Sequence, residues 1–90
     1  MEFEWDKKKA AENIRKHGLS FHEAATAFSD PLAITFDDPE HSIGEHRLLT
    51  FAITRNGKLV IVSHTERNRK MRIISTRLMT KPERKIYENG

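Results

Sequence analysis

The side chains best suited to acid–base chemistry stand at the ends of two predicted strands. Glu45 and Arg47 flank the start of one strand, and His64 ends the next strand along the chain. A carboxylate, an imidazole and guanidinium groups at adjoining strand ends could cleave RNA without a metal. One group would take the 2′-hydroxyl proton, another would protonate the leaving 5′-oxygen, and cations would stabilise the phosphorane. The alternative for His64 is a packed structural residue, because a lone histidine on an apolar strand is more often structural than catalytic.

The most cationic stretch of the chain begins at His64 and holds five cations against one carboxylate. These cations are Arg67, Arg69, Lys70, Arg72 and Arg77. A predicted turn at residues 66–70 could bind phosphate, since cations beside a rigid sheet attract a polyanion. In a regular strand, successive side chains point to opposite faces of the sheet, so Arg72 and Arg77, five residues apart, would lie on opposite faces. An ion pair with a carboxylate from elsewhere in the chain is the alternative role for Arg77.

Charge is divided unevenly along the chain. Residues 1–54 carry 6 Lys or Arg and 10 Asp or Glu, a net charge of −4, whereas residues 55–90 carry 10 and 3, a net charge of +7. A basic half indicates a polyanionic partner such as nucleic acid. An uneven distribution without any ligand is the alternative.

Two helices are predicted in the first third of the chain. Asp6 can cap a helix over residues 7–17, and Gly18 suits the left-handed conformation that ends it. Ser20 begins the second helix, with Glu23 at the spacing of a capping box. The apolar face of this second helix consists of Phe21, Ala24, Ala25 and Phe28.

The rest of the chain predicts strands and one last helix. The strand candidates are a short edge strand at residues 2–5, and residues 32–36, 47–54, 58–65 and 71–77. Asn56-Gly57 predicts a tight hairpin between the two long strands, and Thr80 with Glu83 predicts a capped helix to about residue 88. The predicted fold is α+β: an antiparallel meander of three to four strands with two N-terminal helices and one C-terminal helix.

Length and composition exclude several classes of protein. The 90 residues predict a single domain over residues 1–90, and the lack of cysteine excludes disulfides and Cys-type zinc sites. The neighbouring residues His41, Glu45 and His46 lack metal-ligand spacing, so we expect neither metal nor cofactor. The sequence contains no signal peptide and no apolar run long enough to span a membrane, so we expect a cytoplasmic protein.

Short motifs along nearly the whole chain match one family. They are Phe3-Glu4-Trp5-Asp6, Lys16-His17-Gly18-Leu19-Ser20-Phe21-His22-Glu23-Ala24, Phe28-Ser29-Asp30-Pro31, His41-Ser42, Glu45-His46-Arg47, His64-Thr65, Arg72-Ile73-Ile74-Ser75-Thr76-Arg77, Glu83-Arg84 and Tyr87-Glu88. In these motifs the chain resembles the BrnT toxins of type II toxin–antitoxin systems. One departure is His46, where members of the family often carry a second acidic residue before the arginine.

The resemblance implies a RelE-like fold and a ribonuclease that inhibits translation. It implies RNA as substrate and a BrnA-like ribbon-helix-helix antitoxin as inhibitor, with operator DNA bound only through that antitoxin. Together with the cation pattern, it implies a catalytic set of Glu45, His64, Arg67, Arg72, Arg77 and Tyr87. The predicted RNA-binding set is Arg47, Arg69 and Lys70. The alternative function is a module that binds nucleic acid or a protein partner without chemistry.

Overall fold

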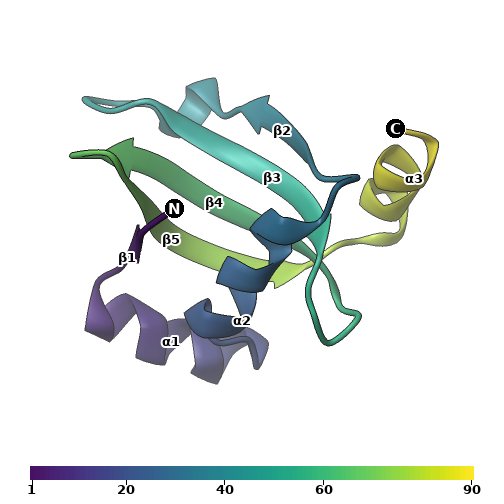
Figure 1. Ribbon diagram of the computed structural model, residues 1–90, viewed down its shortest axis with the longest axis horizontal. Helices are drawn as coiled ribbons and strands as arrows, with labels where there is room; N and C mark the ends of the chain where they lie inside the picture. The colour runs from purple at the N-terminus through teal and green to yellow at the C-terminus, as the bar shows by residue number, and fades with distance from the viewer.

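The computed structural model describes residues 1–90 and consists of a five-stranded sheet with three α-helices (Figure 1). The elements in chain order are β1 (Phe3–Glu4), α1 (Lys7–His17), α2 (Phe21–Thr26), the 3-10 helix η1 (Ala27–Ser29), β2 (Ile34–Asp37), the 3-10 helix η2 (Pro39–His41), β3 (Arg47–Ile53), β4 (Leu59–Arg67), β5 (Lys70–Leu78) and α3 (Lys81–Asn89). None of the helices is long and apolar enough to cross a membrane.

The helix ends follow the local chemistry of the sequence. Asp6 accepts hydrogen bonds from the amides of Lys8 and Lys9, and Gly18 ends α1 with a φ of 67°. The hydroxyl of Ser20 accepts from the Glu23 amide at 3.0 Å, which begins α2. The predicted caps at Asp6, Gly18 and Ser20 are confirmed, because caps depend only on neighbouring residues. The capping box at Ser20 is only half formed, since the Glu23 carboxylate accepts from the hydroxyl of Thr54.

The sheet has more strands than predicted, and it is mixed. Its strand order is β1-β5-β4-β3-β2, and β1 pairs with β5 in parallel, with Phe3 opposite Met71 and Glu4 opposite Arg72. The prediction of a three- to four-stranded antiparallel meander was therefore wrong in detail, although the α+β class is correct. The alternation of residues 2–5 predicted the short edge strand, but its parallel pairing with β5 depends on a contact distant in sequence.

The hairpin between β4 and β5 turns more tightly than predicted. Arg67 pairs with Lys70, so the loop contains only Asn68 and Arg69, both with positive φ (53° and 65°). Positive φ at both central residues is the geometry of a type I′ turn. The predicted five-residue turn at residues 66–70 was wrong, because the strands continue almost to the tip.

A β-bulge interrupts the pairing of β4 with β5. Ser63 lies opposite Ser75 and His64 lies opposite Ile73, so Ile74 is an extra residue in β5. Arg72 pairs with Thr65 and Arg77 pairs with Ile61, and these two β4 residues point to the same face. The prediction that Arg72 and Arg77 face opposite ways was wrong, because the bulge resets the alternation between them.

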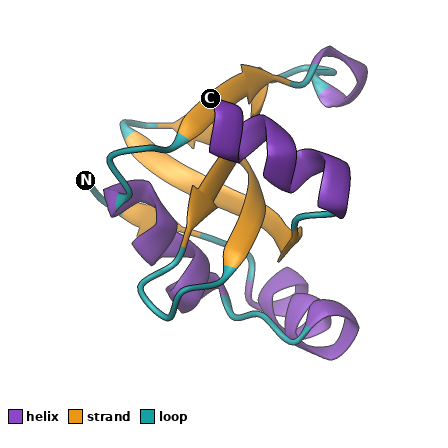
Figure 2. Ribbon diagram, turned by 90° about the vertical axis from the view of Figure 1, so that its right-hand side faces the viewer, coloured by secondary structure: helices purple, strands orange, loops and turns teal.

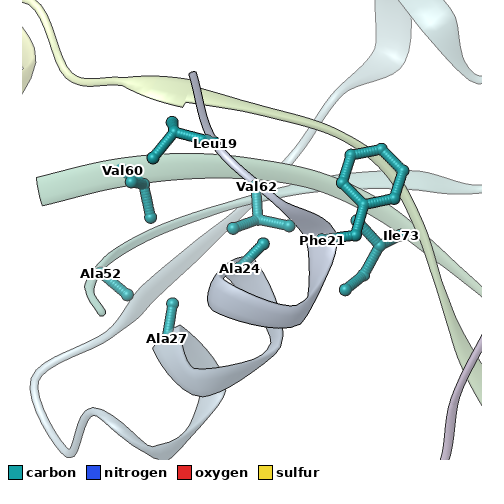
Figure 3. Packing of buried hydrophobic residues seen from close by; sticks show 8 residues of the cluster. All are labelled: Leu19, Phe21, Ala24, Ala27, Ala52, Val60, Val62 and Ile73. Atoms are coloured by element: carbon teal, nitrogen blue, oxygen red, sulfur yellow. The ribbon is translucent and has the colours of Figure 1, made fainter. Parts of the chain in front are cut away.

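The core lies between the sheet and the first two helices (Figure 3). Its fully buried members are Leu19, Phe21, Ala24, Ala27, Ala52, Val60, Val62 and Ile73. We call the sheet surface that carries Val60, Val62 and Ile73 the helix face. The opposite surface, with Ile61 and Ser63, is here called the open face.

The open face is only partly covered. A second, smaller cluster of Phe51, Ile61 and Met79 lies there, with Tyr87 of α3 packed against it. Figures 1 and 2 show α3 apart from α1 and α2. The end of the open face that α3 leaves uncovered carries the polar and charged side chains described next.

Candidate active site

A depression of about 390 Å³ lies on the open face. Its lining residues are Asp38, Glu40, His41, Arg47, Leu49, Ser63, Ile74, Ser75 and Arg77. They come from η2 and the residue before it, the first half of β3, the middle of β4 and the bulged part of β5. Because two of its cations are arginines on rigid strands, we call this depression the arginine pocket.

Arg47 and Arg77 differ in how strongly they are already paired. Arg77 makes two hydrogen bonds to the carboxylate of Glu83 in α3, at 2.7 and 2.8 Å. The Arg77 guanidinium lowers the pKa of Glu83 to about 2, and Glu83 in turn raises the pKa of Arg77. Arg47 has no carboxylate within 4 Å, and its buried Nε has no hydrogen-bond partner. Arg47 is therefore the arginine of this pocket that is free to bind an anion.

A histidine–aspartate pair faces the same pocket. The Nδ1 atom of His41 lies 2.9 and 3.1 Å from the two carboxylate oxygens of Asp38. The side chain of His41 is 62% exposed and that of Asp38 only 13%. Nε2 of His41 has no hydrogen-bond partner in the protein, so it can contact a substrate. An aspartate at Nδ1 orients the ring and leaves Nε2 able to accept a proton.

Hydrogen bonds attach this pair to Arg47. The Asp38 amide donates to the Arg47 carbonyl at 3.0 Å, and the hydroxyl of Ser42 donates to the Asp38 carbonyl at 2.6 Å. The Arg47 amide donates to the same Ser42 hydroxyl at 3.0 Å. Sequence reasoning considered His41 only as a metal ligand and missed the pair. The signal in the sequence was an aspartate, Asp38, three residues before His41, with Ser42 directly after the histidine.

The other predicted cations of the open face are paired with carboxylates. Arg67 donates to Glu45 at 2.8 Å, and Arg72 donates to Glu4 of β1 at 2.7 Å. The hydrogen bond from Arg67 lowers the pKa of Glu45, and Glu45 raises the pKa of Arg67. Glu45 is therefore an ionised ion-pair partner in this structure. The three residues Glu45, Arg67 and Arg72 do not line the arginine pocket.

His64 lies on the helix face, away from the arginine pocket. It is 2% exposed, its Nε2 lies 2.7 Å from the hydroxyl of Thr50, and the ring of Phe28 packs edge-on against it. Burial lowers the pKa of His64 to about 4. Its Nδ1 is buried without a partner, so a second proton there would have no acceptor. The structure thus supports the structural alternative for His64.

The remaining predicted site residues also lie outside the pocket. Arg69 is exposed at the tip of the β4–β5 hairpin, and Lys70 lies 3.7 Å from Glu2. The hydroxyl of Tyr87 donates to Asp30 at 2.6 Å. Burial, with this carboxylate, raises the pKa of Tyr87 to about 12. Of the nine predicted residues, the pocket brings together Arg47 and Arg77.

The structure contains no group of three or more His, Asp or Glu side chains arranged to hold a metal ion. Two histidine–carboxylate pairs, His41 with Asp38 and His46 with Asp37, lie in the loop between β2 and β3 or at its ends. Only the first of these pairs lines the arginine pocket.

Comparison with known proteins gives a family and a fold. A family model described as the ribonuclease toxin BrnT of type II toxin–antitoxin systems matches residues 5–83. The crystal structure of the Brucella abortus ribonuclease toxin BrnT resembles this structure with a TM-score of 0.70. The two chains are 24% identical, and the match covers 90% of this chain and 99% of that chain. No curated protein sequence matches the chain.

Proposed function

Because this chain belongs to the BrnT family of ribonuclease toxins of type II toxin–antitoxin systems, we propose that it is an endoribonuclease that needs no metal and cleaves RNA in the arginine pocket. The observation that carries this proposal is the His41–Asp38 pair, which lines the same depression as the unpaired Arg47. In RNA cleavage by attack of the 2′-hydroxyl, an oriented imidazole can act as the general base and a free guanidinium can stabilise the charge on the phosphorane.

The proposed chemistry begins at Nε2 of His41. The imidazole accepts the proton of the 2′-hydroxyl, whose oxygen attacks the adjacent phosphorus, and the bond from phosphorus to the 5′-oxygen breaks. Asp38 holds the ring by Nδ1 and stabilises the imidazolium that forms. Water in the open depression can supply the proton that the leaving 5′-oxygen needs.

Arg47 and Arg77 have separate parts in this proposal. Arg47 binds the scissile phosphate and stabilises the charge that develops on its oxygens, because no carboxylate neutralises its guanidinium. Arg77 is held in place by the carboxylate of Glu83, which offsets its charge, so in this proposal it forms part of the pocket wall. Glu45, Arg67 and Arg72 form ion pairs outside the pocket, and we leave them, with His64 and Tyr87, out of the proposed catalytic set.

The test compares single variants for RNA cleavage in the presence of EDTA. We expect His41→Gln to lower kcat by about 10²- to 10⁴-fold, the usual contribution of a general base. Arg47→Ala should lower it by about 10²- to 10³-fold through the loss of transition-state stabilisation. Unchanged cleavage by both variants would refute the proposed site, and loss of wild-type cleavage in EDTA would refute metal independence.

The chain offers a matched control for the histidine. His46 is also exposed and also pairs with a carboxylate, Asp37, at 2.8 Å, but it does not line the arginine pocket. His46→Gln should therefore retain wild-type cleavage. Equal loss in the His41 and His46 variants would indicate a general effect of the loop instead of catalysis by His41.

The alternative function, binding without chemistry, makes a different prediction. It requires that RNA bind with a strong dependence on salt and remain intact at every protein concentration. The same cleavage assay therefore separates the two functions.

We also propose that the partner is a BrnA-like antitoxin of the ribbon-helix-helix class, with operator DNA bound through it. Membership of a type II toxin–antitoxin family implies an antitoxin, and the net charge of +7 over residues 55–90 supports an acidic contact surface on that partner. Co-expression with the product of the adjacent gene, followed by purification of the complex, tests this pairing.

A further inference from the structure

A second groove borders the arginine pocket at the edge of the sheet. It has a volume of about 220 Å³ and lies between α1 and β5. Its lining residues are Lys9, Glu12, Asn13, Lys16, His17, Ile74 and Ser75. The last two, Ile74 and Ser75, also line the arginine pocket, so the two depressions meet at the bulge of β5. We call the second depression the α1 groove.

The groove exists because β1 is too short to cover the whole edge of β5. The pairing of β1 with β5 ends at Glu4 and Arg72, so from the bulge onward β5 has no strand on the side away from β4. Helix α1 runs along this edge instead (Figure 1). The side chain of Asn13 accepts a hydrogen bond from the Thr76 amide at 3.0 Å and fixes the helix to the strand. The distance between helix and strand is therefore set by a buried contact.

Helix α1 presents unpaired positive charge to this groove. The helix carries four lysines and one arginine but only one carboxylate, Glu12. None of these cations lies within 4 Å of a carboxylate, whereas Arg67, Arg72 and Arg77 on the open face are all paired. Lys9 and Lys16 are two turns apart on the stripe that also carries the buried Asn13, about 10 Å from each other along the helix axis.

We infer that the α1 groove is a second RNA-binding site, which holds the strand on one side of the cleaved bond. The strand leaves the arginine pocket, crosses the edge of β5 over Ile74 and Ser75, and enters the groove, where Lys9 and Lys16 bind backbone phosphates. This inference rests on the proposed function, since it extends the path of the same substrate. It means that RNA length, and not only the cleaved step, determines affinity.

Continuity with the arginine pocket favours RNA over a protein partner as the occupant. The arginine pocket contains Arg47 and Arg77 beside two carboxylates, and the α1 groove contains Lys9 and Lys16 beside one. A single strand of RNA presents one phosphate per nucleotide to such cations. An acidic segment of the antitoxin would also complement the charge of α1, and the experiment below includes that outcome.

The test measures the binding of 2′-O-methyl oligonucleotides, which cannot be cleaved because they have no free 2′-hydroxyl. We expect Lys9→Ala with Lys16→Ala to weaken binding of a nonanucleotide by about tenfold and to leave a trinucleotide unchanged. The slope of log affinity against log salt should fall in magnitude by about 1.4, since each phosphate contact on a single strand contributes about 0.7. The double variant Lys7→Ala with Lys8→Ala loses the same charge from the same helix outside the groove. It should leave both affinities near those of the wild type.

A variant of opposite sign strengthens the test. Glu12→Gln removes the one carboxylate in the groove and should tighten nonanucleotide binding severalfold without affecting the trinucleotide. Equal effects of the two double-lysine variants, or no effect of either, would overturn the inference. So would a loss confined to the binding of an acidic antitoxin peptide. Since these measurements need no cleavage, the failure of the proposed catalytic function would leave their outcome readable.

Discussion

At the scale of single residues, two histidines differ in their hydrogen bonds and therefore in their roles. The proposed chemistry depends on one, and the packing of the core depends on the other. His41 is exposed, oriented by Asp38 at Nδ1, and free at Nε2. His64 is buried, bonded to Thr50 at Nε2, and has no acceptor near Nδ1. The same side chain therefore serves a proposed base in one place and a neutral core residue in the other.

The burial of His64 predicts how stability changes with pH. The folded pKa of about 4 lies below the ordinary value of 6.5, so on acidification the unfolded chain takes up a proton that the folded chain does not. The stabilisation is complete above pH 6.5 and is lost as the pH falls toward 4. The free energy of unfolding should drop by about 2 kcal/mol between pH 7 and pH 5 from this residue. Denaturant unfolding at both values measures the change.

The control for this prediction is His64→Gln, which has no group that titrates in this interval. Its free energy of unfolding should depend much less on pH than that of the wild type. The pKa of Glu83 is about 2 in the folded chain and 4.5 when unperturbed, and both values lie below the interval, so this carboxylate contributes little to the change. The same pH dependence in both proteins would contradict the assignment.

At the scale of elements, the hairpin between β4 and β5 holds one cationic residue, Arg69, in a strained backbone conformation. Arg69 adopts a φ of 65°, a conformation that costs a residue with a Cβ atom roughly 1 kcal/mol or more compared with glycine. Arg69 was predicted to bind RNA, and it stands at the exposed tip of a two-residue turn. A strained residue that makes no internal contact is a candidate for a functional role.

Arg69→Gly should therefore separate stability from function. The variant should be more stable by about 1 kcal/mol, because Asn-Gly is the preferred sequence of a type I′ turn. If Arg69 binds RNA as predicted, affinity for RNA should fall at the same time. Thermal unfolding and oligonucleotide binding measure the two effects. Arg55→Gly, in the other hairpin and without a positive φ to relieve, should not raise stability.

At the scale of the whole molecule, α3 is the α-helix with the weakest attachment to the rest of the chain. It has no buried residue, whereas α1 contributes Asn13 and α2 contributes Phe21 and Ala24 to the buried interior. Two polar links connect α3 to the rest of the chain. These are the ion pair of Glu83 with Arg77 and the hydrogen bond of Tyr87 with Asp30. Local opening of α3 should therefore require less free energy than opening of the sheet.

Tyr87→Phe tests this view of α3. Loss of a hydrogen bond to a charged group costs about 1.5–3 kcal/mol, so the amides of α3 should exchange with solvent at least tenfold faster. Amides in the centre of β4 should keep their protection, and RNA cleavage should persist because Tyr87 lies outside the arginine pocket. Hydrogen exchange followed by NMR measures the first two effects. An equal increase in α3 and β4 would show that α3 unfolds only with the whole domain.

Local patterns predicted much of the fold. The caps at Asp6, Ser20 and Thr80, the end of α1 at Gly18 and the apolar face of α2 all follow from residues within one or two helical turns. The strand β1 was recognised as an edge strand, but its parallel partner was not. A contact between residues 3 and 71 leaves no periodic signal in either segment.

The sequence by itself determined the helices, the long strands, the basic second half and the resemblance to the BrnT family, because each depends on side-chain type or on spacing within a short segment. Tertiary structure alone decided which charges face one another. One bulge at Ile74 turned Arg72 and Arg77 to the same face, and the pairing of β4 with both β3 and β5 placed Arg47 in one pocket with Arg77. Cross-strand register is set by packing over the whole sheet, and one extra residue in a strand is enough to move a cation from one face of the sheet to the other.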